Sequence, residues 1–216
     1  MVVLRPFSDQ QRGLFLSVDG PSGAGKSTIV GHLAQMLVTA GETVHVTAEP
    51  STGPIGTLAR ELTETVTGPA LACLYAADRY HHIDTEIWPY LERGDTVIVD
   101  RYVPSGLVIQ RFDGVDPAFL WKLNSDARRT DLAVILEADP TVIAQRLDER
   151  GPHNRYQLQP GSSHAEIYFY EQATERLIQA GFDVLRVDCN RQAAHQVAAH
   201  ILDHLMTFFA PAKEPA

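Results

Sequence analysis

The sequence predicts an α/β protein whose core is a parallel sheet of five strands. Five short runs of apolar, mostly β-branched residues alternate with longer stretches that have helical spacing. The first run leads directly into a glycine-rich loop that opens a helix. Strands separated by helices imply right-handed crossovers and a parallel sheet, whose ligands gather at the carboxyl ends of the strands.

Each element follows from its local pattern. The helix after the first strand carries its apolar residues over 29–37, and Gly41 ends it. The expected strands cover residues 15–18, 43–47, 96–100, 132–136 and 183–187. Further helices are expected at residues 55–67, 69–93, 117–125, 141–150, 165–180 and 192–208.

Length and composition favour a single domain. A chain of 216 residues with 44% hydrophobic content can bury one sizeable core without being divided in two. No internal repeat or linker interrupts it. We therefore expect one α/β domain over residues 1–210, followed by a disordered tail at 211–216.

Charge and cysteine content limit the possible partners and location. The net charge is −9 and the isoelectric point is about 5.4, so the surface repels nucleic acid and anionic membranes. No segment has the length of a membrane span or the apolar core of a signal peptide. Cys73 and Cys189 lack C-x-x-C spacing and are expected to be reduced, packed thiols. These features predict a cytoplasmic protein that binds neither nucleic acid nor membrane.

The glycine-rich loop completes the phosphate-binding pattern G-x-x-x-x-G-K-[ST]. Glycines let backbone N–H groups close around phosphate oxygens, Lys26 neutralises the β/γ end, and the Ser27 hydroxyl can ligate Mg²⁺. We therefore expect ATP and Mg²⁺ as donor and cofactor. The ATP-binding residues are predicted to be Gly20, Pro21, Ser22, Gly23, Ala24, Gly25, Lys26, Ser27 and Thr28.

Other residues indicate the second substrate. The chain has no N-K-x-D run for guanine, and no D-x-x-G follows the strand that ends at Asp100, which weakens a GTPase interpretation. Phosphoryl transfer between two anionic substrates requires several cations, so a nucleoside monophosphate acceptor fits an arginine-rich site. The candidate groups are the pairs Asp78-Arg79 and Asp100-Arg101, and the later Arg146, Arg150 and Arg155.

Taken in order, the motifs resemble those of the thymidylate kinase family from about Phe15 to Leu205. The resemblance implies the three-layer α/β/α fold of P-loop NTPases, a pyrimidine nucleoside monophosphate acceptor and a homodimer. It rests on Asp19-Gly20, Glu49-Pro50, Tyr75-Ala76-Ala77-Asp78-Arg79 with His82, Asp100-Arg101-Tyr102 with Ser105 and Gln110, and Arg150-Gly151 with Arg155.

The resemblance also implies roles for single residues. Asp100 would help Ser27 to hold Mg²⁺, Arg101 would clamp the acceptor phosphate, and Arg79 would read the pyrimidine on which Tyr75 stacks. The catalytic set implied is Lys26, Asp100, Arg101, Arg150 and Arg155. The acceptor-binding set is Asp19, Glu49, Tyr75, Arg79, Arg101, Ser105, Ile109 and Gln110.

The residues themselves leave simpler roles open. Asp100 also suits a cap on the following helix, and Arg101 an ion pair with a neighbouring acid. Tyr75 also suits the core, and Asp78 with Arg79 a solvated helical face.

A polar stretch without periodicity follows the helix that Asp139-Pro140 opens, and it predicts a small lid over about 148–163. Because residues 21–24 carry no basic side chain, charge compensation at the γ-phosphate is expected from Arg150 and Arg155 as the lid closes. The alternative is that these arginines form a solvated basic helix end.

Several positions depart from the family pattern. Ala48 stands where arginine is usual, Tyr75 where phenylalanine is usual, and Ile109 where an aromatic packs against the deoxyribose; Asn154 and Gln157 replace acids. A thymidylate-type kinase is the leading hypothesis. The alternative is a kinase for a modified pyrimidine ribonucleotide, such as 5-hydroxymethyl-CMP in nucleoside-antibiotic biosynthesis. A regulatory P-loop ATPase without an acceptor is a third possibility.

Overall fold

A computed structural model of the chain describes residues 12–151, 155–158 and 161–208, and of Arg150 it describes the backbone alone. All strands of its sheet are parallel and follow the order β2-β3-β1-β4-β5. Each observed strand end lies within one residue of the expected end, so the predicted five-stranded parallel sheet is confirmed. The strands are β1 (Phe15–Asp19), β2 (Val44–Ala48), β3 (Thr96–Asp100), β4 (Leu132–Glu137) and β5 (Val184–Asp188).

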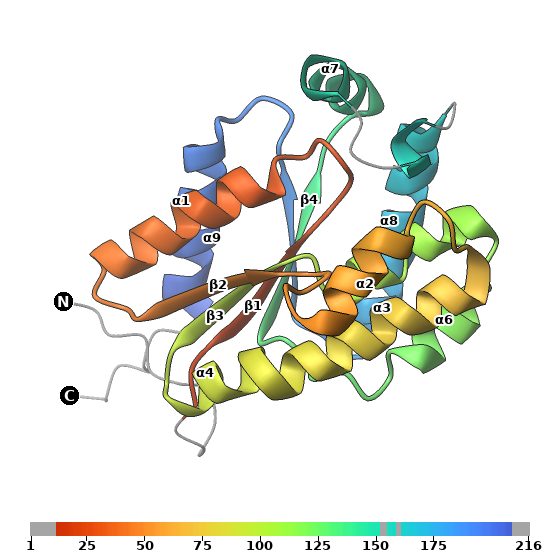
Figure 1. The fold of residues 1–216 in the computed structure, drawn as a ribbon. Coiled ribbons are helices and arrows are strands. Elements are labelled where there is room, and N and C mark those ends of the chain that lie inside the picture. Colours follow the sequence, from red (N-terminus) through yellow and green to blue (C-terminus); the bar gives the residue numbers. More distant parts are fainter. Residues whose placement is uncertain (1–11, 152–154, 159–160, 209–216) are drawn as a thin grey trace, which may run out of the picture.

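Helices cover both faces of the sheet, and the predicted three-layer arrangement is confirmed (Figure 1). On one face α1 (Lys26–Thr39) and α9 (Ala194–Phe208) pack together over a buried apolar cluster. The opposite face carries a second cluster. It is covered by α3 (Gly68–His82), α4 (Trp88–Glu92), α6 (Pro117–Leu123) and α8 (Ser162–Gln179).

The long helix expected at 69–93 is present, but it is not uniform. A π-helical segment, η1 (Ile83–Ile87), joins α3 to α4. The preceding helix, α2 (Pro54–Leu62), ends five residues before the predicted end at residue 67. It stops because the chain turns at Leu62, whose carbonyl accepts from the N–H groups of both Thr65 and Val66.

Three short helical segments have no counterpart among the sequence predictions. They are α5 (Val103–Gly106), η2 (Ile109–Asp113) and η3 (Arg155–Leu158), each too short to show a helical period. The helix α7 (Pro140–Arg150) agrees with its prediction. Cys189 is buried as expected, whereas Cys73 is exposed on α3, so its predicted packing is wrong. The predicted tail at 211–216 lies outside the described residues, as do parts of the predicted lid.

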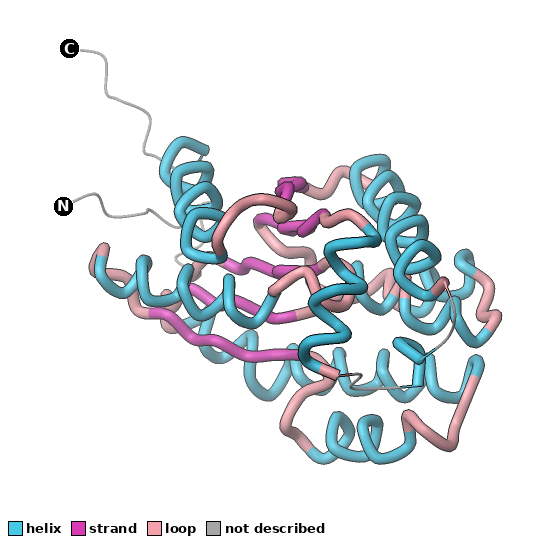
Figure 2. Tube along the Cα trace, turned by 90° about the horizontal axis from the view of Figure 1, so that it is seen from above, coloured by secondary structure: helices cyan, strands magenta, loops and turns pink. Residues whose placement is uncertain are grey.

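The carboxyl ends of the three strands β1, β2 and β3 meet at one edge of the sheet. Val18 of β1 and Ala48 of β2 are both in register with Asp100 of β3. Seen from above, helices lie on both sides of the strands (Figure 2). The segments after these strands carry the phosphate loop, Glu49 and Arg101, so the sheet alone brings the main polar groups of the site together.

Candidate active site

The phosphate loop lies between the carboxyl end of β1 and the start of α1. Gly20 has φ 141°, and a Cβ at this position would lie 2.6 Å from the carbonyl oxygen of Leu136. Glycine is therefore required both by the backbone conformation and by the close approach of β4. Gly23 and Gly25 also have positive φ values, 85° and 95°.

Lys26 is buried inside the phosphate loop. Its Nζ donates to the carbonyl oxygens of Gly20 and Pro21, each at 2.8 Å. Burial, with the nearby charge of Arg101, lowers the pKa of Lys26 to about 7. A phosphate group bound in the loop would stabilise the protonated, charged form of the Lys26 side chain.

Ser27, near the start of α1, and Asp100, at the end of β3, contact each other. The Ser27 hydroxyl donates to Oδ2 of Asp100, while the other carboxylate oxygen, Oδ1, is buried without a hydrogen-bond partner among the described residues. Asp100 does not cap a helix, since α5 has no side-chain cap. A hydroxyl beside a carboxylate with an unsatisfied oxygen is a suitable donor set for a hard divalent cation such as Mg²⁺.

Asp19 lies behind the loop and is fully buried. Its Oδ1 accepts from the backbone N–H of Tyr102, from the backbone N–H of Ser105 and from the Ser105 hydroxyl, at 2.9, 3.1 and 2.6 Å. The Ser105 hydroxyl is also 2.8 Å from the hydroxyl of Tyr170 on α8. Burial raises the pKa of Asp19 despite the hydrogen bonds that lower it. The network joins β1 to the segment after β3.

A pocket of about 130 Å³ opens beside this network. It gathers every predicted acceptor-binding residue except Asp19, which contacts the pocket through Ser105. We call it the acceptor pocket. Its walls are Glu49, Pro50, Thr63, Tyr75, Arg79, Arg101, Tyr102, Ser105, Gly106, Ile109, Gln110 and Tyr156.

Arg79 and Glu49 form a buried ion pair in this pocket. Nη2 of Arg79 is 2.6 Å from Oε2 of Glu49, and both side chains are at most 4% exposed. The guanidinium group also donates to Oδ1 of Asn124 and to the carbonyl oxygen of Tyr102. Asp78, which is 1% exposed, binds the backbone N–H and hydroxyl of Ser51. The alternative of a solvated helical face is therefore wrong.

Arg101 lines the acceptor pocket, and the acids Glu166, Asp100 and Asp19 lie near enough to interact with its charge. Its φ of 72° lies in the left-handed region, which costs a non-glycine residue on the order of 1–3 kcal/mol. Its Nη1 is buried and has no hydrogen-bond partner among the described residues. No ion pair between Arg101 and a carboxylate is found within the described part of the chain. Strain and an unpaired donor together point to an anionic ligand.

Tyr75 and Ile109 both line the acceptor pocket. The Tyr75 hydroxyl is 2.8 Å from Oγ1 of Thr63, so this half-buried ring is tied to the end of α2. Gln110 is buried beside Ile109 in η2. The ring and the aliphatic side chain provide flat and apolar surface of the kind that a base and a sugar require.

The described part of the predicted lid touches both sides of the site. Gln157 donates to the Ser22 hydroxyl of the phosphate loop at 3.1 Å. Arg155 points the other way, with Nε donating to the carbonyl oxygen of Thr63 and Nη2 to Asp113, each at 2.7 Å. The side chain of Arg150 and the whole of Asn154 lie outside the described residues.

Sequence analysis missed several polar groups around the loop. Glu166 on α8 accepts from the backbone N–H and the hydroxyl of Ser22, at 3.0 and 3.2 Å. Arg146, noted earlier only as one of several arginines, donates to the carbonyl oxygens of Gly23 and Cys189. No local motif marks Glu166, because 144 positions separate it from Ser22.

Arg146 also borders a hollow on the α1 side of the loop. This cavity of about 120 Å³ is lined by residues of the loop, α1, α7, the segment after β5 and α9. Burial raises the pKa of the Cys189 thiol there to about 11. The cavity adjoins the phosphate loop and shares no lining residue with the acceptor pocket. Its walls are Ala24, Gly25, Thr28, Ile29, Arg146, Cys189, Gln192, Ala194 and Val197.

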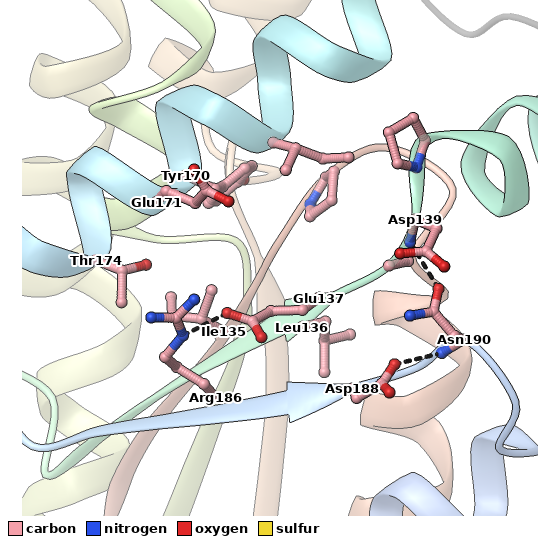
Figure 3. Close-up of a pocket in the computed structure, with 14 residues that line it drawn as sticks. Ile135, Leu136, Glu137, Asp139, Tyr170, Glu171, Thr174, Arg186, Asp188 and Asn190 are labelled. Carbon is pink, nitrogen blue, oxygen red and sulfur yellow. Dashed lines mark hydrogen bonds and ion pairs between the residues drawn. The ribbon is translucent and has the colours of Figure 1, made fainter.

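A wider cavity, about 450 Å³, lies between α8 and the carboxyl ends of β4 and β5 (Figure 3). Among its charged side chains, Glu137 pairs with Arg186, and Asp188 accepts from the backbone N–H of Asn190 (Figure 3). Of the predicted site residues, Pro21 alone lines it. The wider of these cavities is therefore not the one that gathers the predicted site residues.

Among residues 12–151, 155–158 and 161–208, no helix has the length and apolar character needed to cross a membrane.

Comparison with known proteins gives a consistent result. The family model described as "Thymidylate kinase" matches residues 18–193. A protein named "Thymidylate kinase" from Xanthomonas oryzae pv. oryzae (strain PXO99A) is 34% identical over 205 residues, covering 93% of this chain and 89% of that protein. "Probable thymidylate kinase" of Pyrobaculum aerophilum is 34% identical over 193 residues, covering 88% and 94%. That of Staphylothermus marinus is 34% identical over 204 residues, covering 91% and 98%.

Proposed function

Because the chain belongs to the thymidylate kinase family and is thus a nucleoside monophosphate kinase, we propose that it phosphorylates a pyrimidine nucleoside 5′-monophosphate with ATP and Mg²⁺. The observation that supports this most directly is the pair of anion-binding centres at one sheet edge. Lys26 in the phosphate loop suits the donor, and the strained, unpaired Arg101 suits the acceptor phosphate.

In the proposed donor site, residues 20–28 surround the phosphates of ATP, and Lys26 moves its hydrogen bonds from loop carbonyls to phosphate oxygens. Arg146 lines the cavity next to the loop, and we propose that the nucleoside part of ATP lies on this side. Arg146 is thus added to the proposed donor-binding residues.

Ser27 and Asp100 would hold Mg²⁺, which when bound neutralises charge on the donor phosphates. The support is the buried, unpaired Oδ1 of Asp100 next to the Ser27 hydroxyl. The residues themselves align the site: β1 carries the loop, β3 carries Asp100, and the two strands are adjacent.

In the proposed acceptor site Arg101 clamps the phosphate, Tyr75 stacks on the base and Ile109 faces the sugar. Most N–H donors of Arg79 are engaged by Glu49, Asn124 and Tyr102. Arg79 therefore acts on base recognition in two ways: it positions Glu49, and any remaining N–H can donate to the base.

A second acceptor class is favoured by one observation. Glu49 lines the acceptor pocket, and its buried Oε1 lacks a hydrogen-bond partner among the described residues, with Nδ1 of His82 3.6 Å away. A carboxylate oxygen accepts hydrogen bonds, which suits the exocyclic amine of a cytosine better than the O4 of thymine. A modified cytidine monophosphate, such as 5-hydroxymethyl-CMP, is therefore the alternative acceptor, with Ile109 leaving room for a ribose hydroxyl.

The experiment is a panel of acceptors incubated with ATP and Mg²⁺: dTMP, dUMP, dCMP, UMP, CMP and 5-hydroxymethyl-CMP. A kinase forms ADP in proportion to the acceptor diphosphate. ADP formation that is independent of any acceptor would contradict the proposal and indicate a nucleotide-hydrolysing switch. The proposed homodimer and cytoplasmic location stay predictions, to be checked by light scattering and by fractionation of the source cells.

A further inference from the structure

Tyr156 connects the lid to the acceptor pocket. It lines that pocket with Thr63, Tyr75 and Ile109, and it is only 3% exposed. Its ring centroid lies 5.9 Å from that of Phe112 in η2. A residue of the predicted lid is therefore part of the wall that a bound monophosphate would contact.

Asp113 and Arg155 hold Tyr156 in this place. Oδ2 of Asp113 accepts from Nη2 of Arg155 at 2.7 Å, from the Tyr156 hydroxyl at 3.0 Å and from the backbone N–H of Gly68 at 3.2 Å. Arg155 also donates to the Tyr156 hydroxyl at 2.8 Å. The Asp113 side chain is 4% exposed and the Arg155 side chain 21%, so the carboxylate is shielded from solvent and depends on the geometry of the pair.

Arg155 joins three walls of the pocket to one another. Its Nε donates to the carbonyl oxygen of Thr63, whose hydroxyl holds Tyr75. Asp113 ends η2, the short helix that begins with Ile109. The guanidinium group therefore fixes the end of α2 and η2 relative to Tyr156.

The short helix η3, which carries Arg155 and Tyr156, also contacts the phosphate loop. Gln157 donates to the Ser22 hydroxyl, which also binds Glu166 on α8. Of two successive residues, Tyr156 thus lines the acceptor pocket, which we call the acceptor half of the site, and Gln157 contacts the phosphate loop, which we call the donor half.

We propose that Arg155 and Asp113 are positioning residues that hold Tyr156 in the wall of the acceptor pocket, and that Tyr156 determines which monophosphates enter the pocket. We call these three residues the acceptor clasp. The proposal rests on the proposed function, because it concerns the same acceptor pocket. It assigns Arg155 to the acceptor rather than to the γ-phosphate of ATP. The two assignments predict different kinetics.

Arg155→Gln and Asp113→Asn are expected to raise KM for the best acceptor about tenfold, with KM for ATP changed less than about twofold and kcat less than about threefold. The reason is that the clasp shapes the pocket equally in the ground state and the transition state. The double variant should be no worse than the worse single variant, because both changes break one interaction. Arg155→Lys, which keeps a charge beside Asp113, should recover part of the loss.

The matched control is Arg93→Gln. This arginine is 58% exposed and pairs with Asp95, away from the pocket, so its removal should leave all constants unchanged. Thermal unfolding checks that each variant is folded. Calorimetric titration with dTMP and UMP measures acceptor binding without turnover, so a loss of affinity is seen even where activity is too low to measure.

Tyr156→Ala tests specificity. The ratio of kcat/KM between the best and the worst acceptor of the panel is expected to fall at least about tenfold, since one wall of the pocket is removed. Tyr168→Ala, at a position 54% exposed on α8, is the control and should leave the ratio unchanged.

Two results would overturn the proposal. A fall in kcat of about a hundredfold for Arg155→Gln with acceptor KM unchanged would assign Arg155 to the transferred phosphoryl group. An equal loss for every acceptor in Tyr156→Ala would make Tyr156 structural only. A wild-type protein that phosphorylates no monophosphate would instead contradict the proposed function, and the calorimetric comparison would still test the clasp.

Discussion

The basic side chains of the donor half and those of the acceptor half differ in their main hydrogen-bond partners. On the donor side Lys26 and Arg146 donate to backbone carbonyl oxygens of the phosphate loop and its neighbours. On the acceptor side, bonds between side chains dominate, as in the pair of Arg79 with Glu49 and the pair of Arg155 with Asp113.

This difference has a consequence for specificity. A loop built from backbone groups recognises phosphate whatever the rest of the molecule contains. A pocket built from side chains at distant positions changes its shape and hydrogen-bonding pattern when one of them changes. We therefore expect substitutions in the donor half to affect turnover of all acceptors alike, and those in the acceptor half to affect stability and selectivity.

The largest effect is expected for Lys26→Ala. Transfer should fall by at least about a thousandfold, roughly 4 kcal/mol, because the lysine stabilises charge on the moving phosphoryl group. All acceptors should be affected equally. Steady-state rates with two acceptors measure this, with thermal unfolding as the check of the fold. Near-normal turnover and ATP affinity would remove the loop from the mechanism.

Arg79→Met is expected to act on stability. It leaves the Glu49 carboxylate buried without its partner, which typically costs about 3–5 kcal/mol. Chemical denaturation measures the change, and Glu49→Gln in the same chain should recover part of it. The matched control is Arg186→Met at a pair whose side chains are 48% and 40% exposed, where about 1 kcal/mol or less is expected. Equal costs at the two pairs would refute the distinction between buried and exposed pairs.

Arg101→Ala should weaken use of the acceptor more than binding of ATP. About 2–4 kcal/mol of transition-state stabilisation is expected to be lost for one charged clamp. Arg146→Ala is the donor-side counterpart and should raise KM for ATP while leaving acceptor KM unchanged. Kinetics with each substrate varied in turn separate the two. If only the ATP dependence changes in Arg101→Ala, this arginine belongs to the donor half.

The smallest effect concerns the sugar. Because Ile109 is smaller than an aromatic residue and lines the acceptor pocket, discrimination between ribo- and deoxyribonucleotides that share a base is expected to be weak. Ile109→Tyr should strengthen the preference for deoxyribose. The comparison is kcat/KM for such pairs in both proteins. A wild type that already prefers deoxyribose by more than about a hundredfold, roughly 2.7 kcal/mol, would contradict this expectation.

Much of the fold was predictable because its signals are local. The end of β3 at Asp100 follows from a short β-branched run, the end of β1 at Asp19 lies one residue beyond the predicted end, and the start of α1 at Lys26 follows from the glycines before it. Deviations occur where local signals are weak: α2 ends early, and η2 and η3 are too short to have a period. Strand order was not predicted, since it depends on which crossovers pack against which face.

Of the candidate site, the sequence by itself determined the phosphate loop and the residue types that follow each strand, because these are properties of contiguous segments. Only the tertiary structure decided which of those side chains remain available to a ligand. Arg79 is engaged with Glu49 and Asn124, whereas Nη1 of Arg101 is left unpaired, although both arginines follow an aspartate in the sequence. The direction of Arg155 toward Asp113 was decided in the same way, by a carboxylate 42 positions away whose hydrogen bonds form only when the chain has folded.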